Sequence, residues 1–281
     1  MFDAIDVTNR VVTGKQGNIP VRDYRPIAPS EKCRPLLWIH GGGFSGGSIK
    51  MKESDQPARE IAALGRRVVT VDYRLAPTPK LWGASAPGPH PNRFPAAQDD
   101  IVNVARWLAN DSGSGIHMGG ASAGANLTAS ATLRLLDRST SAISSTILAY
   151  GLFHSVLPDS CEIEEGLDWM ARPLFKAGLL RRLAANYTGD ESLVGPGPAF
   201  PGGTDLRRYP PTLMLDAEQD RLRASGSAFH RELVAAGVDV DYHVLEGARH
   251  GFLSWPRHRP FRRSIARMAS WLDRYDNNEP I

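Results

Sequence analysis

Short apolar runs alternate with amphipathic stretches over most of this sequence, and this alternation limits the folds that the chain can adopt. The runs are too short for typical helices and predict buried strands: Leu36–His40, Val68–Tyr73, Ile116–Gly119, Thr146–Leu152 and Thr212–Asp216. Alternating apolar and polar residues at 238–244 predict a further strand, and the stretches at 94–109 and 261–275 place apolar residues at helical spacing. Strands that alternate with helices predict an α/β fold with a mostly parallel sheet that helices cover on both faces.

The chain of 281 residues is long enough to bury one large core, so we expect a single domain over residues 1–281. Two irregular regions interrupt the alternation. The region at 78–92 is rich in Pro and Gly and is predicted to be a surface excursion without regular structure. The region at 153–209 contains a helical stretch at 173–187 and a Gly/Pro-rich run, and it separates two core strands. We expect 153–209 to form a cap above the sheet.

Charge and hydropathy exclude two classes of partner. The formal net charge is +3, and one group of basic residues is dense in the sequence: Arg257, Arg259, Arg262, Arg263 and Arg267. We interpret this group as the solvated face of a terminal helix, so no nucleic-acid partner is expected. No run reaches the ~20 consecutive apolar residues of a membrane span, so no membrane association is expected.

The two cysteines, Cys33 and Cys161, have neither metal-ligand nor redox spacing and are expected to be free thiols. Residues 1–12 alternate acidic and apolar side chains and lack the pattern of a secretory signal. A cytoplasmic protein is therefore expected. The oligomeric state is open, and a homodimer is one arrangement that fits.

The segment Gly120-Ala121-Ser122-Ala123-Gly124 follows a predicted strand and opens a predicted helix. In that setting the pattern is typical of a nucleophile elbow, a strained turn that lifts the serine hydroxyl above the sheet. The small flanking residues are needed because the strand and the helix nearly touch. The alternative is a glycine-rich turn without a chemical role. The setting favours Ser122 as a nucleophile.

A second motif, His40-Gly41-Gly42-Gly43-Phe44, follows an earlier strand. Glycines let the backbone pass close to a ligand with unobstructed amide groups. Acyl transfer needs such donors, because the attacked carbonyl oxygen becomes an anion. The glycine run and the amide of Ala123, the residue after the nucleophile, would supply them. A phosphate-binding loop is disfavoured because neither common phosphate-loop spacing is present.

A serine hydroxyl needs a base, and the base needs a carboxylate that orients it. The histidines that follow the serine motif are His230, His243, His250 and His258. His250 is favoured because it lies in a loop just past a strand predicted to end near Leu245. Asp220, in the loop after 212–216, is the favoured acid, with Asp216 and Glu218 as rivals.

Five motifs in this order resemble the hormone-sensitive-lipase-like family, the bacterial family IV esterases. They are His40-Gly-Gly-Gly-Phe44, Asp72-Tyr-Arg-Leu-Ala-Pro77, Gly120-Ala-Ser-Ala-Gly-Ala-Asn126, Asp220-Arg-Leu-Arg223 and His250-Gly-Phe252. The resemblance implies the α/β-hydrolase fold and hydrolysis of short- to medium-chain carboxylic esters, small molecules, through an acyl-enzyme without metal or organic cofactor. By position it implies the triad Ser122, Asp220 and His250. It also implies Gly42, Gly43 and Ala123 as the donors that stabilise the oxyanion.

The chain departs from the family pattern at Ala121, usually Asp or Thr, and at Ala125, usually Gly. An amidase or formamidase with the same triad is an alternative function. A non-catalytic ligand receptor on the same fold is another, although such receptors tend to lose a triad member. We expect an apolar substrate pocket to be lined from the following residues: Phe44, Phe153, Trp169, Leu174 and Phe175.

Overall fold

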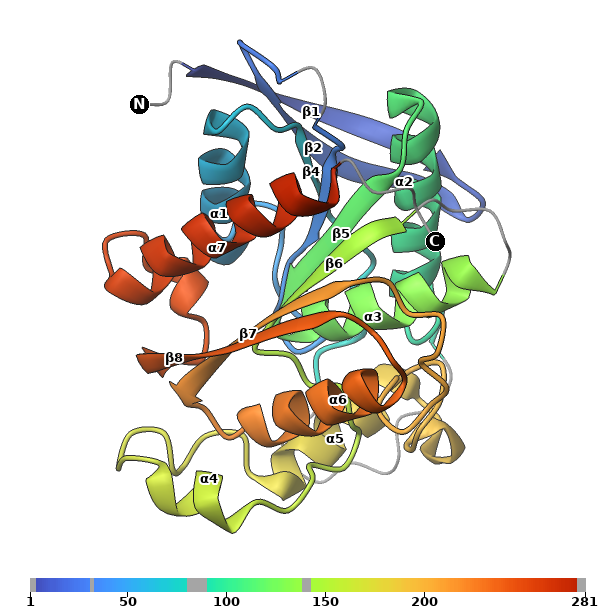
Figure 1. Cartoon of the computed structure of the whole chain (residues 1–281). Helices are drawn as coiled ribbons and strands as arrows, with labels where there is room; N and C mark the ends of the chain where they lie inside the picture. Colours follow the sequence, from blue (N-terminus) through green and yellow to red (C-terminus); the bar gives the residue numbers. More distant parts are fainter. Residues whose placement is uncertain (1–3, 31–32, 80–89, 138–142, 277–281) are drawn as a thin grey trace.

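The computed structural model describes residues 4–30, 33–79, 90–137 and 143–276. At its centre lies an eight-stranded sheet in the order β1-β2-β4-β3-β5-β6-β7-β8 (Figure 1). The strands are β1 (Ile5–Gly14), β2 (Gly17–Pro26), β3 (Leu36–Ile39), β4 (Val68–Val71), β5 (Ile116–Ala121), β6 (Ile143–Ala149), β7 (Thr212–Gln219) and β8 (Val240–Arg249). From β4 to β8 the neighbours are parallel, whereas β1 and β2 form an antiparallel hairpin that joins β4. The expected α/β fold is confirmed.

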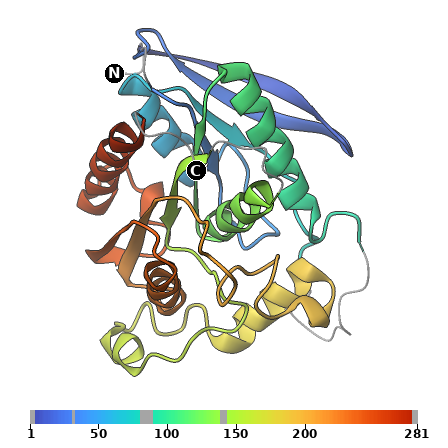
Figure 2. The same ribbon diagram turned by 45° about the vertical axis from the view of Figure 1, so that its right-hand side comes forward.

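Helices cover both faces of this sheet. The helices are α1 (Lys52–Ala63), α2 (Ala96–Ser112), α3 (Ala123–Leu136), α4 (Cys161–Gly166), α5 (Ala177–Thr188), α6 (Arg223–Ala235) and α7 (Arg259–Tyr275). Single-turn helices lie at η2 (Glu191–Leu193) and η3 (Phe252–Ser254). Helices α1 and α7 pack on one face, and α2, α3 and α6 pack on the other (Figure 2). Strands β3 to β7 are therefore buried on both sides, which explains their largely apolar sequences, whereas the edge strand β8 is mostly part-exposed.

The C-terminal helix α7 shows how the sequence pattern fixes the packing. Its apolar stripe of Ile265, Met268 and Leu272 is buried against the sheet. Five arginines of the basic group are exposed to solvent: Arg257, Arg259, Arg262, Arg263 and Arg267. The interpretation of these arginines as a solvated face is confirmed.

Several strand ends differ from the sequence prediction, and two of the differences bear on the site. β6 stops at Ala149 rather than 152, because Tyr150 turns the chain away from the sheet with a positive φ of 39°. β8 continues past Leu245 to Arg249, because it stays paired with the extended end of β7 through Gln219. These two strand ends place Tyr150 and His250, respectively, directly at the carboxyl edge of the sheet.

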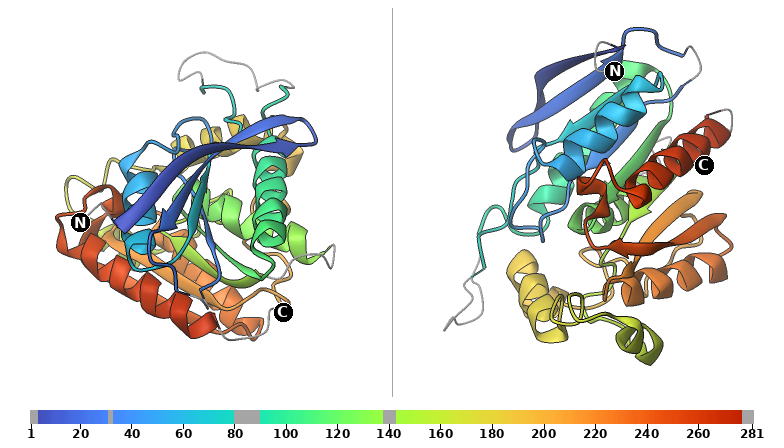
Figure 3. Two further views of the ribbon diagram at one scale, coloured as in Figure 1. Left: turned by 90° about the horizontal axis from the view of Figure 1, so that it is seen from above. Right: turned by 90° about the vertical axis from the view of Figure 1, so that its left-hand side faces the viewer.

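The region between β6 and β7 carries α4 and α5. These two helices lie together at the end of the molecule opposite the hairpin β1–β2 (Figure 3). Residues 80–89 of the excursion predicted at 78–92 lie outside the described residues. Among the helices that the structure describes, none combines the length and the apolar character needed to cross a membrane.

Candidate active site

The motif residues singled out in the sequence all follow parallel strands at their carboxyl ends. Ser122 follows β5, Asp220 follows β7, His250 follows β8, and the glycine loop follows β3. Because the strands are parallel, their carboxyl ends share one edge of the sheet, where open α/β sheets bind ligands. The topology alone therefore gathers residues that are far apart in the sequence.

Ser122 occupies a strained turn between β5 and α3. Its φ of 56° and ψ of −123° lie in a region that side-chain-bearing residues rarely adopt, at a cost of order 1–3 kcal/mol. The turn is held by the amide of Ser122, which donates to the Ala149 carbonyl at 2.9 Å. A Cβ on Gly124 would collide with the carbonyl oxygens of Ile39 and His40, so glycine is required there. The predicted elbow is thus present in the structure.

A continuous hydrogen-bond relay joins the hydroxyl, imidazole and carboxyl groups. The Ser122 hydroxyl lies 2.9 Å from His250 Nε2, and His250 Nδ1 lies 2.6 Å from Asp220 Oδ2. Asp220 is only 2% exposed, and its other oxygen accepts from the Leu222 amide at 3.0 Å. With Nδ1–H donating to Asp220, the Nε2 lone pair of His250 faces the serine hydroxyl.

The rival residues have other partners. Asp216 lies inside β7 and accepts from the Tyr242 hydroxyl at 3.0 Å, and Glu218 accepts from the Gly247 amide at 2.8 Å. His243 pairs with Asp241 at 2.8 Å. The rings of His230 and His258 stack on Tyr242 and Trp255, respectively. Of the residues weighed from the sequence, the structure brings together Asp220 and His250.

Nearby charges raise the pKa of His250. Burial by itself lowers this pKa, but the charge and the hydrogen bond of Asp220 outweigh it, and the charge of Glu53 adds to the increase. The imidazole can therefore take up a proton more readily than a free histidine side chain can.

The glycine loop presents amide groups beside Ser122. Gly42 and Gly43 have positive φ values of 118° and 60°, and a Cβ on Gly41 would lie 3.0 Å from Ser122 Cβ. No residue that the structure describes accepts a hydrogen bond from the amides of Gly42, Gly43 or Ala123. Those three donors are thus available to a ligand at Ser122.

A family model described as alpha/beta hydrolase fold matches residues 36–254. The chain belongs to the α/β-hydrolase family. Esterase LipI of Mycobacterium tuberculosis is 29% identical over 262 residues, covering 89% of this hydrolase and 75% of LipI. Ethyl acetate hydrolase of Pseudomonas putida is 29% identical over 88% of this hydrolase and 76% of that protein. A hyperthermophilic esterase structure from the archaeon Pyrobaculum calidifontis superimposes with a TM-score of 0.81 at 29% identity, covering 96% and 85% of the two chains. The resemblance to the hormone-sensitive-lipase-like esterases is confirmed.

Two residues of the hydrolase site were not singled out from its sequence. Glu53 of α1 is 5% exposed and accepts from the Gly41 amide at 2.9 Å and from the Tyr150 hydroxyl at 3.0 Å. The Tyr150 ring meets the His250 ring edge-on, with centroids 5.0 Å apart. Glu53 lies in a charged stretch with Asp55, which instead pairs with Arg22 and Arg59. No local signal separates the two carboxylates.

The expected apolar lining is only partly present. Phe44 and Phe153 are buried and stack on Tyr187 and Phe229, respectively, whereas Trp169 and Leu174 are exposed. Phe175 does lie on the His250 ring, with centroids 4.5 Å apart.

The segment 153–209 is attached to the loops that carry Asp220 and His250. Arg249, next to His250, forms an ion pair with Asp168, and the Asp168 amide donates to Gln219 at 2.8 Å. Arg221, next to Asp220, forms an ion pair with Glu164. These contacts dock the segment onto the site edge.

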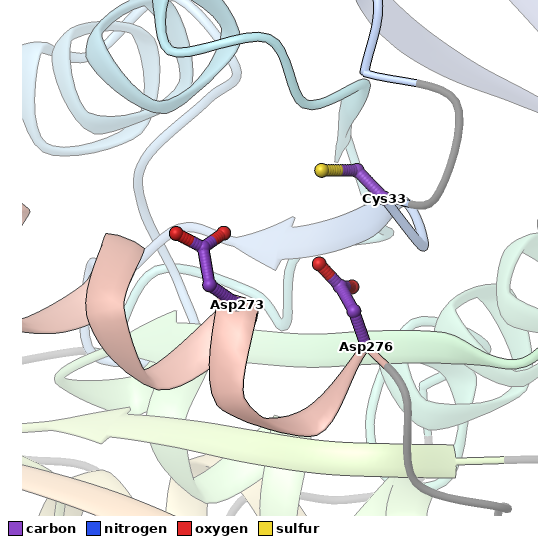
Figure 4. Close-up of side chains that lie close together, drawn as sticks. All are labelled: Cys33, Asp273 and Asp276. Atoms are coloured by element: carbon purple, nitrogen blue, oxygen red, sulfur yellow. The ribbon is translucent and has the colours of Figure 1, made fainter.

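One group of possible metal ligands occurs among the described residues: Cys33, Asp273 and Asp276 (Figure 4). The two carboxylates already have a cationic partner, because Arg66 donates to Asp273 at 2.9 Å and to Asp276 at 2.7 Å. The guanidinium occupies the position of a cation, so the donor set does not fit a metal ion. The group lies near the end of α7, on elements that do not carry the relay.

Proposed function

We propose that this hydrolase cleaves carboxylic esters through an acyl-enzyme on Ser122. The observation that carries the proposal is the unbroken relay from the Ser122 hydroxyl through His250 to Asp220. The family match and the esterases among its relatives support the same chemistry.

In the acylation step, His250 Nε2 takes the hydroxyl proton as Ser122 Oγ attacks the ester carbonyl carbon. Asp220 stabilises the imidazolium that forms. The carbonyl oxygen becomes an anion next to the amides of Gly42, Gly43 and Ala123, which have no acceptor within the described chain. One such donor is worth about 10²–10³ in turnover. The imidazolium then protonates the departing alcohol.

In the deacylation step, His250 removes a proton from a water molecule, and the resulting hydroxide attacks the acyl carbonyl. The same amides stabilise the second tetrahedral intermediate. Collapse of that intermediate returns the proton to Ser122 and releases the carboxylic acid. The free enzyme is restored with no external reductant, oxidant or metal consumed.

The proposed substrates are esters with short to medium acyl chains. Phe175 lies on the His250 ring, and Leu183 of α5 comes within 3.9 Å of a Cβ built on Gly43. Both residues belong to 153–209, which we propose as a cap on a single domain of residues 1–281. A relative named ethyl acetate hydrolase supports small esters.

Ser122→Ala tests the proposal. We expect it to lower ester turnover by about four orders of magnitude or more and to abolish labelling by a phosphonate probe, because no other hydroxyl is in the relay. Ser114→Ala, a change at an exposed serine, is the matched control and should keep wild-type rates. Near-normal turnover in Ser122→Ala would contradict the assignment.

Nitrophenyl esters from acetate upward, paired with the matching amides, measure chain-length preference and separate an esterase from an amidase.

The cellular location and the assembly state are also proposals. A cytoplasmic location is supported by Cys33 and Cys161, which are both free thiols. A homodimer remains an expectation that light scattering of the purified protein measures directly.

A further inference from the structure

The buried carboxylate of Glu53 contacts two parts of the site but belongs to neither the relay nor the glycine loop. It enters from α1, whose first turn is fixed to β3 by the Trp38 indole N–H donating to the Glu53 carbonyl at 3.1 Å. The Glu53 side chain therefore has a defined position behind the site. Burying a carboxylate costs folding free energy unless each of its oxygens has a hydrogen-bond partner. The partners of the Glu53 oxygens therefore indicate what this side chain does.

One oxygen of Glu53 fixes the glycine loop. Oε1 accepts from the Gly41 amide at 2.9 Å, immediately before the two amides proposed to bind the oxyanion. A Cβ on Gly41 would collide with this same oxygen, so the loop and the carboxylate are in close contact. Holding Gly41 fixes the direction in which the next amides point.

The other oxygen of Glu53 faces the base. Oε2 accepts from the Tyr150 hydroxyl at 3.0 Å, and the Tyr150 ring packs against His250. Oε2 also lies 3.9 Å from a Cβ built on Gly251, the residue after His250. The carboxylate is thus near both the partner and the backbone of the imidazole.

We propose that Glu53 is a positioning residue of the esterase: it holds the oxyanion loop through Gly41 and supplies, beside Asp220, a second negative charge that stabilises protonated His250. The inference rests on the proposed function. The charge acts where the imidazole is transiently cationic, and the hydrogen bond acts where the oxyanion forms. Both effects favour the transition state over the free enzyme.

Several titratable groups face His250, and the test must separate them. Asp220 bonds Nδ1, Asp216 lies on β7, Tyr150 packs on the ring, and Glu53 acts from α1. Burial lowers the pKa of His250, whereas the charges of Asp220 and Glu53 raise it, and burial keeps Asp216 largely protonated. Burial also raises the pKa of Tyr150 well above its ordinary value, so the tyrosine stays neutral. Removal of the Glu53 charge alone should thus lower the His250 pKa.

The experiment compares Glu53→Gln with Glu53→Ala. Glutamine keeps an acceptor for the Gly41 amide but removes the charge, so the His250 pKa should fall. NMR titration of the His250 ring, assigned with His250→Asn, measures this shift without any substrate. The acid limb of the pH profile of kcat/KM should move to lower pH by the same amount.

Alanine removes the loop contact as well. We expect Glu53→Ala to lower kcat by about 10²-fold with little change in KM, because a displaced donor weakens binding of the oxyanion only. Glu53→Gln should recover most of that kcat. The matched control is Glu60→Gln, on the same helix and outside this network, and it should match wild type in every readout.

An unshifted His250 pKa in Glu53→Gln, together with a normal kcat in Glu53→Ala, would overturn the inference. Circular dichroism would show whether Glu53→Ala folds. If it does not, an unshifted His250 pKa in Glu53→Gln is enough to overturn the inference. Absence of ester hydrolysis by the wild type would reject the proposed function instead, since the NMR titration is read without turnover.

Discussion

Asp216 is a second buried acid close to the relay, and its environment differs from that of Asp220. Asp216 is 1% exposed, and a Cβ on Gly226 of α6 would collide with its carboxyl group. Burial raises the pKa of Asp216 to about 8, and the charge of Asp220 adds to the increase. The hydrogen bond from Tyr242 opposes this increase without cancelling it. Asp216 is therefore largely neutral at pH 7.

Asp216→Asn should stabilise the fold most at alkaline pH. Between about pH 4, where an unfolded aspartate ionises, and about pH 8, the folded protein keeps a proton that the unfolded chain has lost. The contribution of Asp216 to the free energy of unfolding therefore falls as the pH rises across that window. Asparagine does not ionise, so the variant lacks this loss of stability. Urea unfolding at pH 5 and pH 9 measures the difference, with the exposed Asp159→Asn as control. An equal effect at both pH values would contradict the expectation.

Individual site residues could be predicted where the local backbone conformation requires particular residue types. Ser122 and the loop at 40–44 were recognisable because tight turns require glycine or alanine at fixed offsets. Glu53, Tyr150 and Asp216 acquire their roles from burial by elements distant in sequence. Their neighbours in the chain look ordinary, so only the folded structure separates Glu53 from Asp55.

Two ion pairs dock the segment 153–209 onto the strand ends. Arg249 and Asp168 are both partly exposed, at 42% and 34% of their side chains. Arg249 immediately precedes His250, so its pairing is coupled to the position of the His250 ring. Exposed pairs of this kind weaken as salt screens them.

Arg249→Gln should lower kcat/KM for esters by about three- to tenfold, because the docked segment places Phe175 over the base. Added sodium chloride should lower the wild-type rate towards that of the variant and leave the variant nearly unchanged. Arg207→Gln breaks a local, exposed pair with Asp205 and is the matched control. A salt response as large in Arg249→Gln as in wild type would contradict this role.

The elements were predicted best where packing and local pattern agree. All six core strands predicted between 36 and 244 occur. The helix expected over 173–187 begins at Ala177 instead, because Phe175 takes a positive φ of 53°. That conformation cannot continue a helix, and it serves the contact of Phe175 with His250, a tertiary demand that periodicity does not reveal.

A buried charge cluster joins the end of α7 to the amino ends of the central strands. Arg66 and Asp276 are 4% and 6% exposed at their side chains and pair at 2.7 Å. Asp276 also accepts from the Arg34 amide at 3.0 Å, and its Oδ1 lies 3.1 Å from His117 Nε2. Residues separated by up to 242 positions thus meet at one point, at the opposite strand ends from the proposed active site.

Asp276→Asn should therefore reduce stability and leave catalysis intact. Neutralising Asp276 leaves the buried Arg66 guanidinium with only the exposed carboxylate of Asp273 as a charged partner, so the free energy of unfolding should fall by about 3–5 kcal/mol. Burial alone would raise the pKa of Asp276, but the bonds from Arg66 and His117 hold it well below its ordinary value. The stabilisation is thus complete above about pH 4 and is lost as the pH falls further, so the variant and wild type should converge in acid. Denaturant unfolding from pH 7 to pH 3 measures this convergence.

Asp273→Asn, at a side chain that is 71% exposed, is the control and should cost less than about 1 kcal/mol. If Asp276→Asn matched that control at pH 7, the cluster would not hold the two ends of the chain together.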